Sequence, residues 1–166
     1  AVVFALQAAQ SGYDVRSQLM SELALGDHGS WMIVAFLGLA VSSAGLGAAL
    51  LALPRQLFEA TIFLSASIAF LGSGIATLRS APTLHIVLIS VAFISIVLGM
   101  YLVPRTALLR ARRLRVTSNL LAIFVAAFVA AGSLGIDMGV AQRLAATSLL
   151  LWFILVGWHI AAGKNA

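Results

Sequence analysis

Long apolar stretches separated by short polar connections dominate the sequence. A helix needs about 20 apolar residues to cross the hydrocarbon core of a bilayer. Five stretches meet this length, and they cover residues 31–53, 58–78, 84–103, 119–136 and 143–161. Connections this short place successive helices antiparallel. The pattern therefore predicts an all-α fold in which residues 1–166 form a single polytopic transmembrane domain.

A shorter apolar run, residues 1–10, precedes the five stretches. We expect it to be the end of a sixth helix that is truncated at Ala1. A signal peptide is the alternative, but no basic segment precedes the run. In the following connection, Val15, Leu19 and Leu23 recur at every fourth position among polar residues. This spacing predicts a short amphipathic helix lying at the membrane interface.

Small residues recur at helical spacing within two of the predicted spans. Such faces let helix backbones approach closely inside a membrane. The positions are Gly38, Ser42, Gly45, Gly47, Ser65, Ala69 and Ser73. We favour packing within the bundle as their role, and an interface for other membrane protein subunits is the alternative.

Composition and charge place the chain in a membrane and orient it. The sequence is 62% hydrophobic and 9% charged, whereas a soluble domain carries roughly 25% charged residues. One side of the predicted bundle holds seven basic residues, namely Arg55, Arg105, Arg110, Arg112, Arg113, Arg115 and Lys164. The other side holds three, namely Arg16, Arg79 and Arg143. The positive-inside rule therefore predicts that both termini lie in the cytoplasm.

The arginine-rich connection suggests a lipid partner. Arg105, Arg110, Arg112, Arg113 and Arg115 lie between two spans, interleaved with leucines. An arginine beside the membrane gains about 1 kcal/mol from anionic headgroups, so we expect contact with anionic lipid in addition to a role in topology. Nucleic acid is not an expected partner, because the connection is held to the bilayer at both ends and lacks an aromatic residue for base stacking.

Ionisable residues are absent from the middle of every predicted span, which argues against a proton pump, an ion-coupled transporter or a voltage sensor. The candidates for chemistry gather at the outer ends as a polar network. They are Glu22, Asp27, His28, His85, Asp137 and Arg143. Their residue types suit a metal, but no two share a helix at the spacing of ligands. We favour a salt-bridged cap in which Arg143 pairs with Glu22 or Asp137.

The sequence offers little evidence for a bound cofactor or for catalysis. His85 and His159 lie at opposite ends of their spans, so one haem cannot bridge them. The sequence has no cysteine, no nucleophile elbow and no glycine-rich phosphate loop. We therefore expect no catalytic residue, no metal and no cofactor.

Several short motifs carry a family resemblance. Gly12-Tyr13 and Ser21-Glu22-Leu23-Ala24 precede the first full span, His85 opens a later one, and Ala141-Gln142-Arg143-Leu144 opens the last, which contains Trp152. In this order the chain, from about Gly12 to its end, resembles the bacterial and archaeal membrane proteins grouped as domain of unknown function 998, which implies a bacterial or archaeal cytoplasmic membrane. The resemblance implies six helices and no known activity. The family often has an acidic residue before the histidine helix, and residues 79–83 have none.

Three functions are consistent with these features. The leading hypothesis is a non-enzymatic accessory or structural subunit of a larger membrane complex. The second is an outer-face lipid-binding protein or membrane enzyme that uses Glu22, His85 and Arg143, and it requires a lipid-sized cavity reaching all three. The third is a small-solute transporter, which requires a water-filled path.

Overall fold

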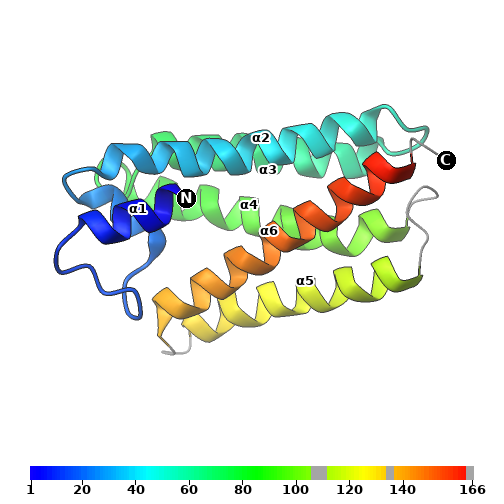
Figure 1. The fold of residues 1–166 in the computed structure, drawn as a ribbon. Helices are drawn as coiled ribbons and strands as arrows, with labels where there is room; N and C mark the ends of the chain where they lie inside the picture. The colour runs from blue at the N-terminus through cyan, green and yellow to red at the C-terminus, as the bar shows by residue number, and fades with distance from the viewer. Residues whose placement is uncertain (106–111, 134–136, 164–166) are drawn as a thin grey trace.

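The computed structural model describes residues 1–105, 112–133 and 137–163 (Figure 1). Every regular element in these ranges is a helix. In chain order they are α1 (Val2–Ala9), η1 (Met20–Leu25), η2 (Gly29–Trp31), α2 (Met32–Leu51), α3 (Leu57–Ile75), α4 (Pro82–Leu102), η3 (Val103–Arg105), α5 (Arg112–Ser133) and α6 (Met138–Gly163). The elements η1, η2 and η3 are short 3₁₀ helices.

Five of these helices are long and apolar enough to cross a membrane. The prediction of a polytopic helical bundle is therefore confirmed. Two helices begin earlier than expected: α5 starts at Arg112 rather than Asn119, and α6 starts at Met138 rather than Arg143. Arginine side chains can extend toward the interface from a helix that continues beyond the hydrocarbon, so an apolar criterion places the start of α5 too late. The earlier start of α6 has a different reason, because Asp137 and Gly139 are typical of a loop.

The connection between α1 and α2 differs from the predicted amphipathic helix. Only Met20–Leu25 and Gly29–Trp31 are helical, and both are 3₁₀ turns. Asp14 accepts hydrogen bonds from the backbone amides of Arg16 and Ser17, which closes a local turn in place of a helix. Val15 and Leu19 therefore lie outside the helical turns, although Leu23 is fully buried.

The elongated bundle has two distinct ends (Figure 1). We call the "loop end" the one that carries residues 10–31, the α3–α4 connection and the start of α6. We call the "arginine end" the one that carries the α2–α3 connection, η3, the start of α5 and the end of α6. Helix α6 crosses the bundle obliquely, and the short α1 lies beside the bundle at the loop end only.

An aromatic stack forms the centre of the core. The rings of Phe63 on α3 and Trp152 on α6 lie 5.7 Å apart and nearly parallel, and both are fully buried. The indole N–H of Trp152 donates to the hydroxyl of Ser118 on α5 at 2.9 Å. Gly99 on α4 lies directly against the Phe63 ring, where a side chain would collide with it. These contacts join the α5–α6 pair to α3 and α4.

The small residues divide into two groups. Gly47, Ala69 and Ser73 are buried, and a Cβ atom added at Gly47 would lie 3.1 Å from the Leu64 side chain of α3. This group packs within the bundle. The other group is exposed and consists of Gly38, Ser42, Gly45 and Ser65. No neighbouring atom lies within 4 Å of a Cβ atom added at Gly38 or Gly45.

Candidate functional site: an arginine clasp and two grooves

Arg143, in the first turns of α6, joins three segments at the loop end. Its Nη1 donates to the carbonyl oxygens of Gln18 at 3.2 Å and Gly139 at 2.7 Å, and its Nη2 donates to the hydroxyl of Tyr13 at 2.6 Å. With its amide oxygen turned toward the guanidinium, Gln7 of α1 accepts from Nη2 at 2.8 Å and from Nε at 3.2 Å. All five N–H bonds of the guanidinium thus have acceptors. We call this set of contacts the "Arg143 clasp".

The clasp gives Arg143 partners other than the expected carboxylates. Each acceptor is neutral, and Asp137 instead pairs with Arg16 at 3.5 Å across an exposed surface. Glu22 accepts from the backbone amide of Leu19 at 3.0 Å and from the Gln18 side chain at 3.3 Å. Glu22 and Arg143 therefore share Gln18 as a neighbour. Exposed pairs such as Arg16–Asp137 contribute about 0–1 kcal/mol, so the clasp has the larger structural role.

Further hydrogen bonds hold the 10–31 connection onto the bundle. The Gln142 side chain of α6 accepts from the Met20 amide at 2.6 Å, and the Gln10 side chain donates to the Leu23 carbonyl at 2.7 Å. Gly139 allows this connection to approach α6 closely, because a side chain there would collide with its carbonyl oxygens. Sequence reasoning missed the contribution of Gln142, although its position beside Arg143 at the start of a span was visible.

Asp14 organises the exposed part of the same connection. A hydrogen bond from the Ser17 hydroxyl, and then one from the backbone amide of Arg16, hold the pKa of this carboxyl below its ordinary value of 3.8. A carboxylate that accepts hydrogen bonds is stabilised in its charged form. The turn is therefore a local feature of the charged state of Asp14.

His85 is separate from the clasp and links α4 to α3. The residue is 3% exposed, and its Nδ1 lies 2.9 Å from the Ser73 carbonyl oxygen and 2.8 Å from that of Ala76. Carbonyl oxygens only accept, so Nδ1 carries the hydrogen and satisfies the C-terminal end of α3. The Phe36 ring meets the imidazole edge-on at 5.6 Å, and Nε2 is buried without a hydrogen-bond partner.

The remaining candidates of the outer network do not join these groups. Asp27 and His28 are exposed on the connection before α2. Within the described ranges no three histidine or acidic side chains come together as metal ligands. Glu22 and Arg143 thus both contact Gln18, whereas His85 contacts residues of α3 and α2 instead.

A long groove, the α2–α6 groove, runs between α2 and α6, and the start of α1 with parts of η1 and α4 also line its half at the loop end. Its half at the loop end has a volume of about 440 Å³, and its half toward the arginine end about 630 Å³. Ser42 lines both halves. Along α2 the lining extends from Met32 to Ala49, which at 1.5 Å per residue is about 26 Å. The groove therefore crosses nearly the whole hydrocarbon thickness of about 30 Å.

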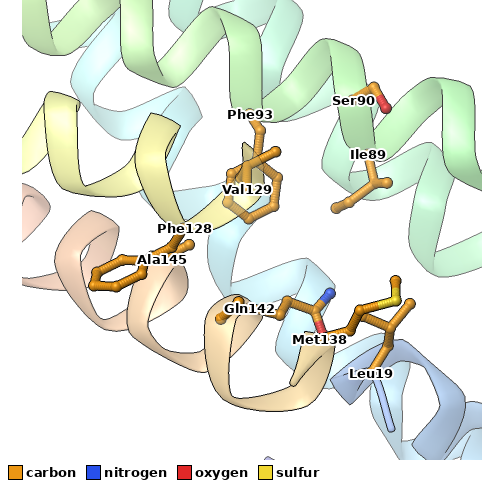
Figure 2. Close-up of a pocket in the computed structure, with 10 residues that line it drawn as sticks. Leu19, Ile89, Ser90, Phe93, Phe128, Val129, Met138, Gln142 and Ala145 are labelled. Atoms are coloured by element: carbon orange, nitrogen blue, oxygen red, sulfur yellow. The ribbon is translucent and has the colours of Figure 1, made fainter. Parts of the chain in front are cut away.

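A second, shorter groove, the α4–α5 groove, has a volume of about 780 Å³. On α5 its lining extends from Asn119 to Ala130, which corresponds to about 16 Å. A small cavity of about 180 Å³ adjoins it between α4, α5 and α6, with Gln142 and Met138 on one wall and Phe93 on another (Figure 2). Phe93 lines this cavity and both grooves at the loop end.

The hypothesis of an outer-face lipid-binding protein or enzyme requires a cavity that reaches Glu22, His85 and Arg143. The α2–α6 groove reaches Ser21 and Gln142, next to Glu22 and Arg143 in the chain, and Phe36, which contacts His85. Glu22, His85 and Arg143 themselves do not line it. Nor do they together line the α4–α5 groove or the small cavity beside it.

The predicted arginine cluster lies at the opposite end. Arg105 donates to the carbonyl of Tyr101 and, at 3.3 Å, to the side chain of Asn119, while its guanidinium lies 3.5 Å from the centre of the Tyr101 ring. Arg112, Arg113 and Arg115 are exposed in the first turns of α5. Arg110 lies outside the described residues.

Comparison with known proteins gives one match. A family model described as "Protein of unknown function (DUF998)" matches residues 1–159. No curated protein and no solved structure matches the chain.

Proposed function

The chain belongs to the DUF998 family of proteins of unknown function, and from its geometry we propose that it is a non-enzymatic accessory subunit of a larger membrane complex. A transmembrane helix of a partner subunit packs into the α2–α6 groove. The observation that carries this proposal is the exposure of small residues along a groove that crosses both leaflets.

The lining of the groove suits a helix. Gly38, Ser42, Gly45 and Ala49 follow one another along α2, and Gly157 and Ala161 face them from α6. A Cβ atom added at Gly38, Gly45 or Gly157 would meet no atom within 4 Å, so space remains beside the backbone. Small residues promote helix association in membranes because they allow backbones to approach closely. A helix with its side chains is about 10–12 Å wide and needs such a surface.

The polar residues support a structural rather than a catalytic role. The guanidinium of Arg143 is saturated by neutral acceptors, and Nδ1 of His85 is occupied by two carbonyl oxygens. A nucleophile or general base needs an adjacent partner and access to a substrate. We further propose that the arginine end lies in the cytoplasm, since it carries most of the basic residues, and that these arginines contact anionic lipid.

Co-purification with matched variants tests the accessory role. The protein would be extracted from its own membranes in mild detergent and weighed by native mass spectrometry. We expect a defined partner polypeptide, and Gly45→Leu should reduce its recovery at least tenfold because the leucine fills the groove. Ser65→Leu is the control, since Ser65 is also small and exposed but lines neither groove.

Two outcomes would contradict the proposal. One is a chain that is always recovered alone. The other is a partner whose recovery falls equally with Gly45→Leu and Ser65→Leu, because the groove would then have no special part in binding.

A further inference from the structure

The α4–α5 groove is apolar along its length and ends at a cation. Its lining includes Val97, Leu98, Ala122 and Ala126, with Tyr101 and Asn119 at the end nearest the arginines. Its length of about 16 Å on α5 matches one leaflet, which is half of the roughly 30 Å hydrocarbon core. Its volume of about 780 Å³ lies within the roughly 300–1,000 Å³ of sites that hold small-molecule ligands. These dimensions fit an acyl chain of a single leaflet.

Arg105 is held at the mouth of this groove. Its side chain lies over the Tyr101 ring and donates to Asn119, and both of these residues line the groove. These contacts connect α4 to α5 and hold the guanidinium at the mouth of the groove. Donors that remain on the guanidinium are available to an anion, because an arginine carries five N–H bonds.

Two further arginines extend the groove-lining face of α5. Residues three, four and seven positions apart share one face of a helix. Arg112, Arg115 and Asn119 have this spacing, and it continues through Ala122 and Ala126. Arg112 and Arg115 therefore stand above the mouth of the groove on the same face.

Arg113, by contrast, lies about 100° around the helix from Arg112, because an α-helix has 3.6 residues per turn. It is exposed like its neighbours but does not share the groove-lining face. The chain thus contains its own matched control for a test of position against charge.

The cations at this mouth lack acidic partners. Of the five acidic residues in the sequence, only Glu59 lies at the arginine end, in the first turn of α3. No carboxylate lies within ion-pair distance of Arg105, Arg112 or Arg115 in the parts of the chain that the structure describes. Three cations beside the positive end of the α5 dipole repel one another, and an anion placed among them relieves this repulsion.

We propose that the α4–α5 groove binds an anionic phospholipid. One acyl chain lies along Val97, Leu98, Ala122 and Ala126, and the phosphate lies among Arg105, Arg112 and Arg115. Arginine binds phosphate oxygens with two parallel hydrogen bonds, which favours a phosphate over a simple surface charge. This site does not depend on the accessory role, because apart from Phe93 its lining residues differ from those of the α2–α6 groove.

Native mass spectrometry of the purified protein with phosphatidylglycerol or phosphatidylcholine tests the site. We expect a defined number of phosphatidylglycerol molecules to stay bound and phosphatidylcholine to be lost. Arg112→Gln or Arg115→Gln should each weaken phosphatidylglycerol binding about fivefold. This factor corresponds to the loss of about 1 kcal/mol, which is the contribution of one arginine near an anionic surface. Arg113→Gln should change it less than twofold. Equal effects of all three substitutions would overturn the proposal, because they indicate unspecific attraction.

Filling the groove separates the acyl site from attraction of the headgroup alone. Ala126 lines the groove and Ala127 does not, and both are exposed. Ala126→Trp should remove bound phosphatidylglycerol while all arginines remain, and Ala127→Trp should retain it. Circular dichroism verifies that each variant keeps its helices. A folded Ala126→Trp protein that binds phosphatidylglycerol like Ala127→Trp would overturn the proposal.

Discussion

The α2–α6 groove and the α4–α5 groove are both apolar but differ in length and in their ends. The first spans about 26 Å along α2, where a row of glycine, serine and alanine lies among larger apolar side chains. The second spans about 16 Å along α5, has no glycine in its lining, and ends at Arg105. A full-length row of small residues complements a helix, whereas a single-leaflet surface ending in cations complements a lipid.

The contrast shows how a chain with few charges can distinguish two kinds of partner. Hydrophobicity is common to both surfaces, and lipid tails are as apolar as leucine side chains, so hydrophobicity alone gives no selectivity within a bilayer. Side-chain size and the position of cations provide it. Of the following predictions, those at Arg143 and Tyr101 change one surface while the other serves as the reference.

The largest effect is expected from the aromatic core, on which both grooves depend. Trp152→Ala removes a fully buried ring stacked on Phe63 and should destabilise the protein by about 3–5 kcal/mol. Thermal unfolding in mild detergent measures the loss, and both binding activities should disappear with the fold. Trp158→Ala is the control, because Trp158 is 74% exposed and should change stability by less than about 0.5 kcal/mol. Equal stability of the two variants would refute this assignment of the core.

A smaller and more selective effect is expected at the Arg143 clasp. Arg143→Gln removes hydrogen bonds that hold α1 and the 10–31 connection at the mouth of the α2–α6 groove, at a cost of about 2–3 kcal/mol. Limited proteolysis should then cut the connection faster, and recovery of the partner should fall. Phosphatidylglycerol binding at the other groove should stay within twofold, and an equal loss at both sites would show that the grooves are not independent.

A weaker effect is expected from the ring beneath Arg105. Tyr101→Leu removes a cation–π contact of about 0.5–1 kcal/mol, which corresponds to a two- to fivefold loss of phosphatidylglycerol affinity. Tyr101→Phe keeps the ring and should bind like the unchanged protein. Recovery of the partner should be the same in both variants. A loss with Tyr101→Phe equal to that with Tyr101→Leu would assign the effect to the hydroxyl instead.

The smallest effect is the pH dependence of the turn at Asp14. Its pKa is lower in the folded protein than the ordinary 3.8, so the charged carboxyl stabilises the turn above pH 3.8 and this contribution is lost as the pH falls through the lower folded value. The hydrogen-exchange protection factors of the Arg16 and Ser17 amides should be highest above pH 3.8 and fall as the pH passes through the lower folded pKa. Asp14→Asn should remove this dependence, and an unchanged profile would exclude Asp14 as its cause.

The sequence predicts the spans well because each is long and uniformly apolar. It predicts the helix start at Arg112 poorly, because polar residues continue a helix beyond the hydrocarbon without an apolar signal. It misses the start at Met138 because Asp137 and Gly139 are typical of a loop. The polar residues at the outer ends of the spans could be identified from the sequence, but their hydrogen-bond partners could not. Arg143 donates to amide, hydroxyl and carbonyl oxygens of residues far away in the chain, and His85 hydrogen-bonds to the end of α3. Long-range partners of this kind depend on tertiary packing, which periodicity does not encode.

The grooves themselves could not be located from the sequence. Small residues at positions 38, 45, 47 and 69 look alike in a helical pattern, yet the first two are exposed and the last two are buried. Which face is covered depends on the oblique path of α6 across the bundle (Figure 1). The shared face of Arg112, Arg115 and Asn119 was hidden for a different reason, since the predicted helix began only at Asn119.

The most direct test of the difference between the grooves is photo-crosslinking in native membranes. A photoreactive amino acid would replace Gly45 in the α2–α6 groove and, in a separate protein, Ala126 in the α4–α5 groove. We predict that position 45 yields an adduct with a second polypeptide and position 126 an adduct with phospholipid, each identified by mass spectrometry. The same class of adduct at both positions, or an adduct at position 45 that stays within this chain, would contradict the account.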